Sequence, residues 1–137
     1  MQSIWADAKV MVVDDLEQNV RLLRRLLSRA GYERIESAGD GESALDLFRA
    51  FDPDIILLDL HMPKMNGAEL LRRIRSVLSG RTYLPVLVLT ADASVETKRE
   101  VLAAGAMDFV AKPFDMEEVL LRVGNLLQTR SLHLHME

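Results

Sequence analysis

The sequence predicts a doubly wound α/β domain with a five-stranded parallel sheet and helices on both faces. Short apolar runs alternate with helical patterns about five times along the chain, which is typical of this fold class. The runs at residues 10–13, 55–58 and 86–89 are unbroken, as expected of strands that are covered on both faces. The runs at residues 34–37 and 107–111 mix apolar with polar residues, as edge strands do. With right-handed crossovers, this pattern fits the strand order 2-1-3-4-5.

Two helices are predicted from apolar periodicity in the first half of the chain. After Asp15, apolar residues recur at steps of four and three, and Gly31 supplies a left-handed stop. The members of this apolar face are Leu16, Val20, Leu23, Leu27 and Ala30. Residues 40–51 form the second predicted helix, with Asp40 as its N-cap and Pro53 as a block to continuation.

Three further helices are predicted from capping signals. Two of them begin where an N-cap residue is followed three positions later by an acid. These pairs are Asn66 with Glu69, and Asp115 with Glu118. Ser94 can cap the remaining helix, which we expect to end at Gly105.

Length and composition indicate one domain. The chain has 137 residues and no cysteine, which excludes a disulfide scaffold, a thiolate metal site and a catalytic thiol. Its net charge of −4 gives no electrostatic reason to bind nucleic acid directly. The start lacks a basic segment before a long apolar one, and no run approaches the ~18 apolar residues that span a bilayer. We therefore expect a soluble, cytoplasmic protein without membrane contact.

Five polar residues stand directly after predicted strands, namely Asp14, Asp15, Asp59, Thr90 and Lys112. The carboxyl ends of parallel strands meet at one rim of the sheet, which is where ligands bind in open α/β sheets. Clustered carboxylates persist as anions when a cation lies among them, and Mg²⁺ is the natural choice for oxygen ligands. The lysine and the hydroxyl suit an anion. The rim therefore predicts phosphoryl chemistry.

The motifs at this rim resemble the receiver domain of bacterial two-component response regulators. They are D-D after the first strand, D-x-x-M-P-x-M-x-G at residues 59–67, T-A after the fourth strand and K-P-F after the fifth. The resemblance implies a flavodoxin-like, or CheY-like, sheet. It covers residues 9–127, leaving residues 1–8 as an N-terminal lead. Residues 128–137 would form a helical extension that could begin a linker to an output domain absent from this chain.

The resemblance also implies roles for the rim residues. Asp59 would take a phosphoryl group from a sensor histidine kinase or phosphotransfer protein. Asp15 would ligate Mg²⁺, or alternatively Mn²⁺, directly, and Asp14 largely through water. Asp59 and the backbone carbonyl of His61 would complete the protein ligands. Lys112 would pair with Asp59 before phosphorylation and with a phosphoryl oxygen after it.

A switch is implied as well. Thr90 and the Ala91 N–H would bind phosphoryl oxygens, and Phe109 would turn into the space that Thr90 vacates. The face of the fourth helix, fifth strand and fifth helix would then bind a partner, or the chain would form a homodimer through this face or its C-terminal helix. Phe109 could equally be a plain core aromatic residue. His61 and Asp92 stand at positions that tune the phosphate lifetime, or else they are loop residues that point to solvent.

Two other functions remain open. A pseudo-receiver would keep the fold as a binding module without phosphorylation, although all five rim residues are present. A Mg²⁺-dependent phosphatase of the haloacid dehalogenase type also uses an Asp nucleophile. It places that residue in a D-x-D motif after the first strand, whereas this chain has D-D-L-E-Q at residues 14–18. The resemblance instead implies a protein that is no enzyme beyond catalysing its own phosphorylation and dephosphorylation.

Overall fold

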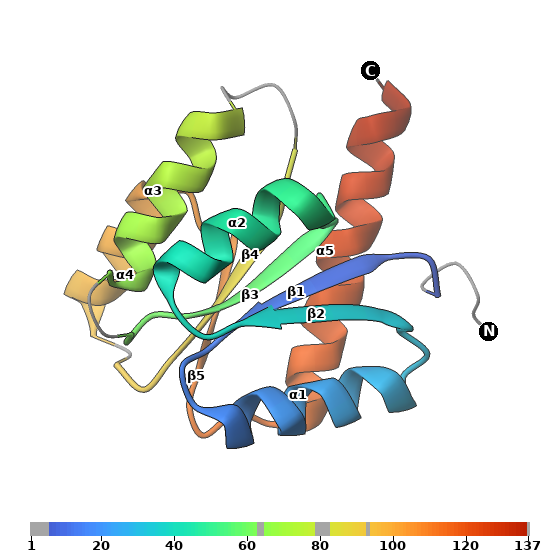
Figure 1. Cartoon of the computed structure of the whole chain (residues 1–137), viewed down its shortest axis with the longest axis horizontal. Coiled ribbons are helices and arrows are strands. Elements are labelled where there is room, and N and C mark those ends of the chain that lie inside the picture. The colour runs from blue at the N-terminus through green and yellow to red at the C-terminus, as the bar shows by residue number, and fades with distance from the viewer. Residues whose placement is uncertain (1–5, 63–64, 79–82, 93, 137) are drawn as a thin grey trace.

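Five parallel strands form one sheet in the order β2-β1-β3-β4-β5 (Figure 1). The computed structural model describes residues 6–62, 65–78, 83–92 and 94–136. The strands are β1 Lys9–Val13, β2 Arg34–Ala38, β3 Ile55–Asp59, β4 Val86–Thr90 and β5 Asp108–Ala111. The predicted strand order is confirmed, with the two mixed-polarity strands β2 and β5 at the edges.

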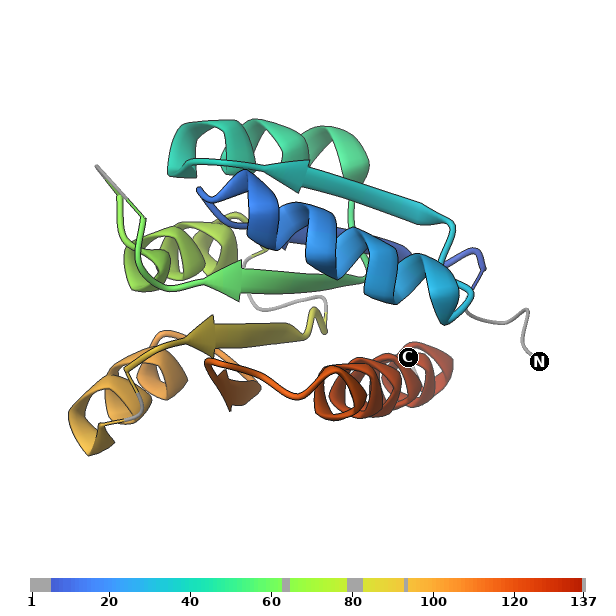
Figure 2. The same cartoon turned by 90° about the horizontal axis from the view of Figure 1, so that it is seen from below.

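Helices cover both faces of the sheet, as Figures 1 and 2 show. They are α1 Glu17–Arg29, α2 Gly41–Phe51, α3 Gly67–Leu78, α4 Val95–Ala103 and α5 Met116–Met136. One face packs against α2, α3 and α4, and the other against α1 and α5. In the part of the chain that the structure describes, no helix is long and apolar enough to cross a membrane.

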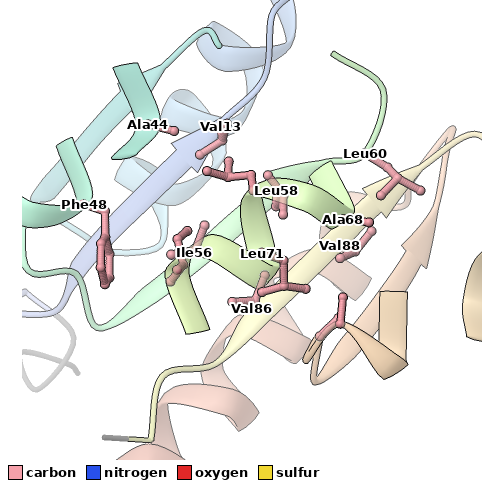
Figure 3. Close-up of a cluster of buried hydrophobic side chains, with 14 of the residues drawn as sticks. Val13, Ala44, Phe48, Ile56, Leu58, Leu60, Ala68, Leu71, Val86 and Val88 are labelled. Carbon is pink, nitrogen blue, oxygen red and sulfur yellow. The ribbon is translucent and has the colours of Figure 1, made fainter. Parts of the chain in front are cut away.

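Each central strand contributes to two separate cores. Met11 and Val13 of β1 belong to the core under α2, α3 and α4, whereas Val10 and Val12 belong to the core under α1 and α5. Figure 3 shows part of the first core, where Val13 and the β3 residue Leu58 are among the labelled side chains. Successive side chains of a strand point to opposite faces, so a strand covered on both sides needs an unbroken apolar run.

Side-chain caps fix the starts of the helices. Asp40 accepts a hydrogen bond from the Ser43 N–H at 2.8 Å, and Asn66 accepts one from the Glu69 N–H at 2.9 Å. Each bond satisfies a donor that the first turn of a helix otherwise leaves unpaired. The caps predicted at Ser94 and Asp115 also form, with Thr97 and Glu117 as their respective donors.

The prediction for α1 is wrong at its two ends. Leu16 is 50% exposed and Ala30 is exposed, while Leu26 is buried with Leu23 and Leu27. The buried stripe is therefore shorter than the predicted apolar face, because Leu16 and Ala30 are the N-cap and C-cap residues that flank the helix. The glycine stop predicted for α4 is confirmed, because Ala104 is the C-cap and Gly105 follows it with a left-handed φ of 113°.

The C-terminal part of α5 packs against the end of the sheet opposite the rim. Arg130 Nε lies 3.2 Å from Asp54 Oδ1, and Arg130 also donates a hydrogen bond to the Tyr83 carbonyl. The rings of Tyr83 and His133 stack with centroids 4.1 Å apart. Leu127 is buried in the core under α1 and α5. This segment of helix is therefore held against its own domain.

Candidate functional site

The rim at the carboxyl ends of β1 and β3 carries three carboxylates. Oxygen atoms of Asp14, Asp15 and Asp59 lie within 4.8 Å of one another. Asp14 and Asp59 are buried, with exposed fractions of 3% and 4%, and Asp15 is exposed. The sequence prediction that these acids converge is thus matched by the geometry. Two buried anions at this spacing repel each other unless a cation lies nearby.

Asp14 is held in place by its own loop and by α1. Its Oδ1 accepts a hydrogen bond from the Leu16 N–H at 2.9 Å, and its Oδ2 accepts one from Asn19 Nδ2 at 3.2 Å. Sequence reasoning missed Asn19, although its position one turn into the helix after the D-D pair could have drawn notice. These contacts fix the carboxylate before any ligand binds.

Lys112 supplies the positive charge of the site. Its Nζ lies 3.2 Å from Asp59 Oδ1 and 3.7 Å from Asp14 Oδ2, and its side chain is 21% exposed. The Lys112 N–H donates to the Thr90 carbonyl at 2.7 Å, which joins the ends of β4 and β5. One ammonium group therefore contacts both buried carboxylates.

The pKa of Asp59 is raised above its usual range. Burial is the main cause, and the charge of Asp14 adds to it. Lys112 and the His61 N–H, which donates to Asp59 Oδ1 at 3.4 Å, lower the pKa without offsetting burial. Ionising Asp59 therefore costs more free energy in the folded protein than in water, and a further cation at the rim would lower that cost.

The remaining predicted residues lie around this centre. Thr90 is fully buried at the end of β4, and Ala91 after it is exposed. Phe109 is half-buried on β5, and the side chain of His61 is exposed. Asp92 is exposed too, but both its carboxylate oxygens accept hydrogen bonds from residues at the start of α4. It is therefore bound to α4 rather than pointing freely to solvent.

Gly67 explains the glycine of the D-x-x-M-P-x-M-x-G motif. A Cβ atom at this position would lie 2.9 Å from the Asp59 carbonyl oxygen and 2.9 Å from the Leu60 Cα. The Gly67 N–H donates to the Leu60 carbonyl at 2.9 Å, so α3 begins directly against the backbone after Asp59. Only glycine permits this approach without a backbone shift. Its place in the motif was the signal in the sequence.

The response regulator receiver domain family matches residues 10–124. The chain belongs to this family. Regulatory protein AtoC of Escherichia coli K12 is 39% identical over 132 residues, covering 93% of this chain and 28% of that protein. Response regulator MprA of Mycolicibacterium vanbaalenii is 44% identical over 120 residues, covering 88% of this chain and 50% of that protein. This receiver domain thus spans half or less of these two relatives.

Solved structures agree with this assignment. The CheX–CheY–BeF3–Mg complex from Borrelia burgdorferi contains a chain similar to this receiver domain, with a TM-score of 0.80 and 30% identity over 87% of this chain and 88% of that one. The resemblance drawn from the strand-end motifs is therefore confirmed at the level of family and fold.

Proposed function

We propose that this receiver domain accepts a phosphoryl group on Asp59 from a sensor histidine kinase or phosphotransfer protein and thereby switches a binding face. The observation that carries the proposal is the setting of Asp59. Its carboxylate is buried, faces the Lys112 ammonium at 3.2 Å and lies with Asp14 and Asp15 in one cluster. A carboxylate beside an ammonium group, with further acids that can hold a cation, is suited to attack phosphorus, because the cations offset the negative charge that the phosphoryl group brings.

Mg²⁺ fits the donor set at the rim. Asp14, Asp15 and Asp59 offer hard oxygen ligands within 4.8 Å of one another, and the backbone carbonyl of His61 would add a fourth. Mn²⁺ accepts the same ligands. When bound, the ion would supply positive charge to neutralise the phosphoryl oxygens near the carboxylates. Burial, and after it the charge of Asp14, raises the pKa of Asp59, and a bound cation would oppose both by favouring the ionised carboxylate.

In the reaction, a carboxylate oxygen of Asp59 attacks the phosphorus of a phosphohistidine. The P–N bond breaks as the P–O bond forms, and the ring leaves as neutral imidazole, with its proton either already on the other ring nitrogen or taken from solvent as the bond breaks. Lys112 would move its ion pair from Asp59 to a phosphoryl oxygen. The Thr90 hydroxyl and the Ala91 N–H would donate to the other oxygens.

The output would be a changed binding face. When Thr90 turns toward the phosphoryl group, the half-buried ring of Phe109 can move into the vacated space. The face formed by α4, β5 and α5 would then bind a partner or a second copy of the chain. Because AtoC and MprA are longer than this chain, we infer that an output domain could be linked to it. We expect it to act in a bacterial cytoplasm.

Incubation with acetyl phosphate and Mg²⁺, followed by intact mass measurement, tests the proposal. We expect one added phosphoryl group in the wild type and none in Asp59→Asn or in EDTA. Asp46→Asn, an exposed acid on α2, is the matched control and should be labelled normally. Hydrolysis of acetyl phosphate without a trapped adduct would favour a phosphatase, and neither adduct nor hydrolysis would favour a pseudo-receiver.

His61 and Asp92 are proposed to set the lifetime of the phosphoryl group. The exposed His61 side chain follows Asp59 by two residues and would shield the phosphorus from water. We expect His61→Ala to shorten the decay time of the phosphorylated protein. An unchanged decay rate would contradict this role.

A further inference from the structure

A network of hydrogen bonds joins Thr90 to the first turn of α4. The Asp92 N–H donates to Thr90 Oγ1 at 3.0 Å. The Asp92 carboxylate accepts from the Ser94 N–H at 3.0 Å and from the Thr97 hydroxyl at 2.6 Å. Ser94 in turn accepts from the Thr97 N–H at 3.2 Å as the helix N-cap. We call these four residues, Thr90, Asp92, Ser94 and Thr97, the cap network.

The cap network contains more bonds than a helix start requires. Ser94 alone satisfies the Thr97 N–H, which is the usual role of an N-cap. Asp92 adds a second connection from the same turn back to the Thr90 hydroxyl. Hydrogen bonds from Thr97 and then Ser94 also hold the pKa of Asp92 below its usual range. Since Asp92 is exposed, these bonds and not burial fix its orientation.

The next residue of the same turn contacts Phe109. Lys98 Nζ lies 5.4 Å from the centroid of the Phe109 ring, which is within range of a cation–π interaction. Phe109 is half-buried and packs at the border of the core under α2, α3 and α4. Two successive residues, Thr97 and Lys98, therefore connect α4 to the two side chains that are expected to move in the switch.

We propose that the first turn of α4 stabilises the unphosphorylated conformation, with Asp92 and Thr97 as positioning residues for Thr90 and Lys98 as a positioning residue for Phe109. This inference rests on the proposed function, and it names the contacts that the switch must break. Turning the Thr90 hydroxyl toward a phosphoryl oxygen pulls it from the Asp92 N–H. Moving the Phe109 ring inward takes it from beneath Lys98. Contacts present in one state only bias the equilibrium toward that state.

The first test uses beryllofluoride with Mg²⁺ as a phosphoryl mimic. Thr97→Val keeps the shape of the side chain and removes the hydroxyl that binds Asp92. The change also removes the acceptor of the Ser94 hydroxyl. We expect the beryllofluoride concentration at half-response of the α4 amide signals in NMR spectra to fall about three- to tenfold, the size expected from the lost bond to Asp92. Thr129→Val, which removes a hydroxyl bonded to Asn125 on α5, should respond like the wild type. An unchanged or higher midpoint in Thr97→Val overturns the inference.

The second test addresses Lys98. Lys98→Met keeps an unbranched side chain but removes the charge over the ring, and should lower the same midpoint about two- to fivefold. Lys98→Arg retains a cation and should restore wild-type behaviour, whereas a purely structural role for the side chain would not depend on charge. Equal midpoints for Lys98→Met and Lys98→Arg would overturn the part assigned to Lys98.

A measurement without ligand separates this inference from the proposed function. In the ligand-free protein, Thr97→Val should speed amide hydrogen exchange at residues 96–99 and shift the ring signals of Phe109. If wild-type protein fails to bind beryllofluoride, the proposed function fails. The signals of the ligand-free protein still show whether the first turn of α4 is coupled to Phe109. Unchanged Phe109 signals in Thr97→Val would overturn the coupling even where beryllofluoride binds normally.

Discussion

Two aspartates mark the two ends of β3, and their surroundings differ. Asp54, just before the strand, pairs with Arg130 at 3.2 Å and accepts the Lys9 N–H at 2.8 Å. Asp59, the last residue of the strand, is more deeply buried and lies in a cluster with two other carboxylates. Burial raises the pKa of Asp59, with Asp14 as a second cause. Asp54 is paired and stabilises the fold, whereas the ionised form of Asp59 is disfavoured, as suits the phosphoryl acceptor that we propose.

The largest stability effect is expected at the Asp54 end. Arg130→Ala should lower the free energy of unfolding by about 2 to 3 kcal/mol, because it removes a charge-assisted hydrogen bond and leaves Asp54 without this partner. The Arg130 side chain is only 12% exposed, so solvent screens the pair weakly. Urea denaturation measures the change. Arg73→Ala, which breaks an exposed pair with Glu69, should change stability by less than about 0.5 kcal/mol.

The next largest effect is expected where α3 begins beside Asp59. Gly67→Ala places a Cβ 2.9 Å from two backbone atoms, so it should cost about 2 kcal/mol and lower the yield of phosphorylated protein. Gly124→Ala, on α5, is the matched control, because a Cβ atom at this position would have no neighbouring atom within 4 Å. It should raise stability by about 0.5 to 1 kcal/mol. Equal effects of the two changes would contradict the close approach at Gly67.

A smaller effect of opposite sign is expected at Asp59. Its raised pKa means that the folded state binds a proton more tightly than the unfolded chain does. Its contribution to stability is therefore most favourable at low pH and is lost as the pH rises through the folded pKa. In EDTA, Asp59→Asn should raise the free energy of unfolding by about 1 kcal/mol near neutral pH. The gain should shrink as the pH falls through the raised folded pKa of Asp59 and should be gone below about pH 4, the unfolded value. A gain that grows at low pH would contradict this assignment.

The sequence was sufficient for the sheet order and for the rim because both leave local patterns. Unbroken apolar runs distinguish central strands from edges, and a polar residue directly after each run must lie at the same end of a parallel sheet. Side-chain pairs between distant segments leave no such pattern. Arg130 and Asp54 are 76 positions apart, and either residue alone resembles an ordinary surface charge. The exposed ends of α1 were misjudged because apolar periodicity does not report which residues flank the helix as caps.

The contacts of α4 with Asp92 and Phe109 could not be predicted from the sequence either. The sequence does not say whether the Asp92 side chain points to solvent, whereas the structure shows that it accepts hydrogen bonds from Ser94 and Thr97. The contact between Lys98 and Phe109 depends on how α4 sits over β5, which apolar periodicity does not specify. The residues of α4 that contact Thr90 and Phe109 therefore come from the structure, whereas the rim residues can be predicted from their positions after the strands.

The most direct test of the central claim is the stability gained on adding beryllofluoride and Mg²⁺ to three proteins. At about one hundred times its Kd, a ligand that binds only the folded state adds about 2.7 kcal/mol. We predict this gain for the wild type and for Arg130→Ala, whose site is intact, and none from beryllofluoride for Asp59→Asn. An equal gain in Asp59→Asn, or the loss of the gain in Arg130→Ala, would contradict the claim that Asp59 binds the phosphoryl group while the Asp54–Arg130 pair only stabilises the fold.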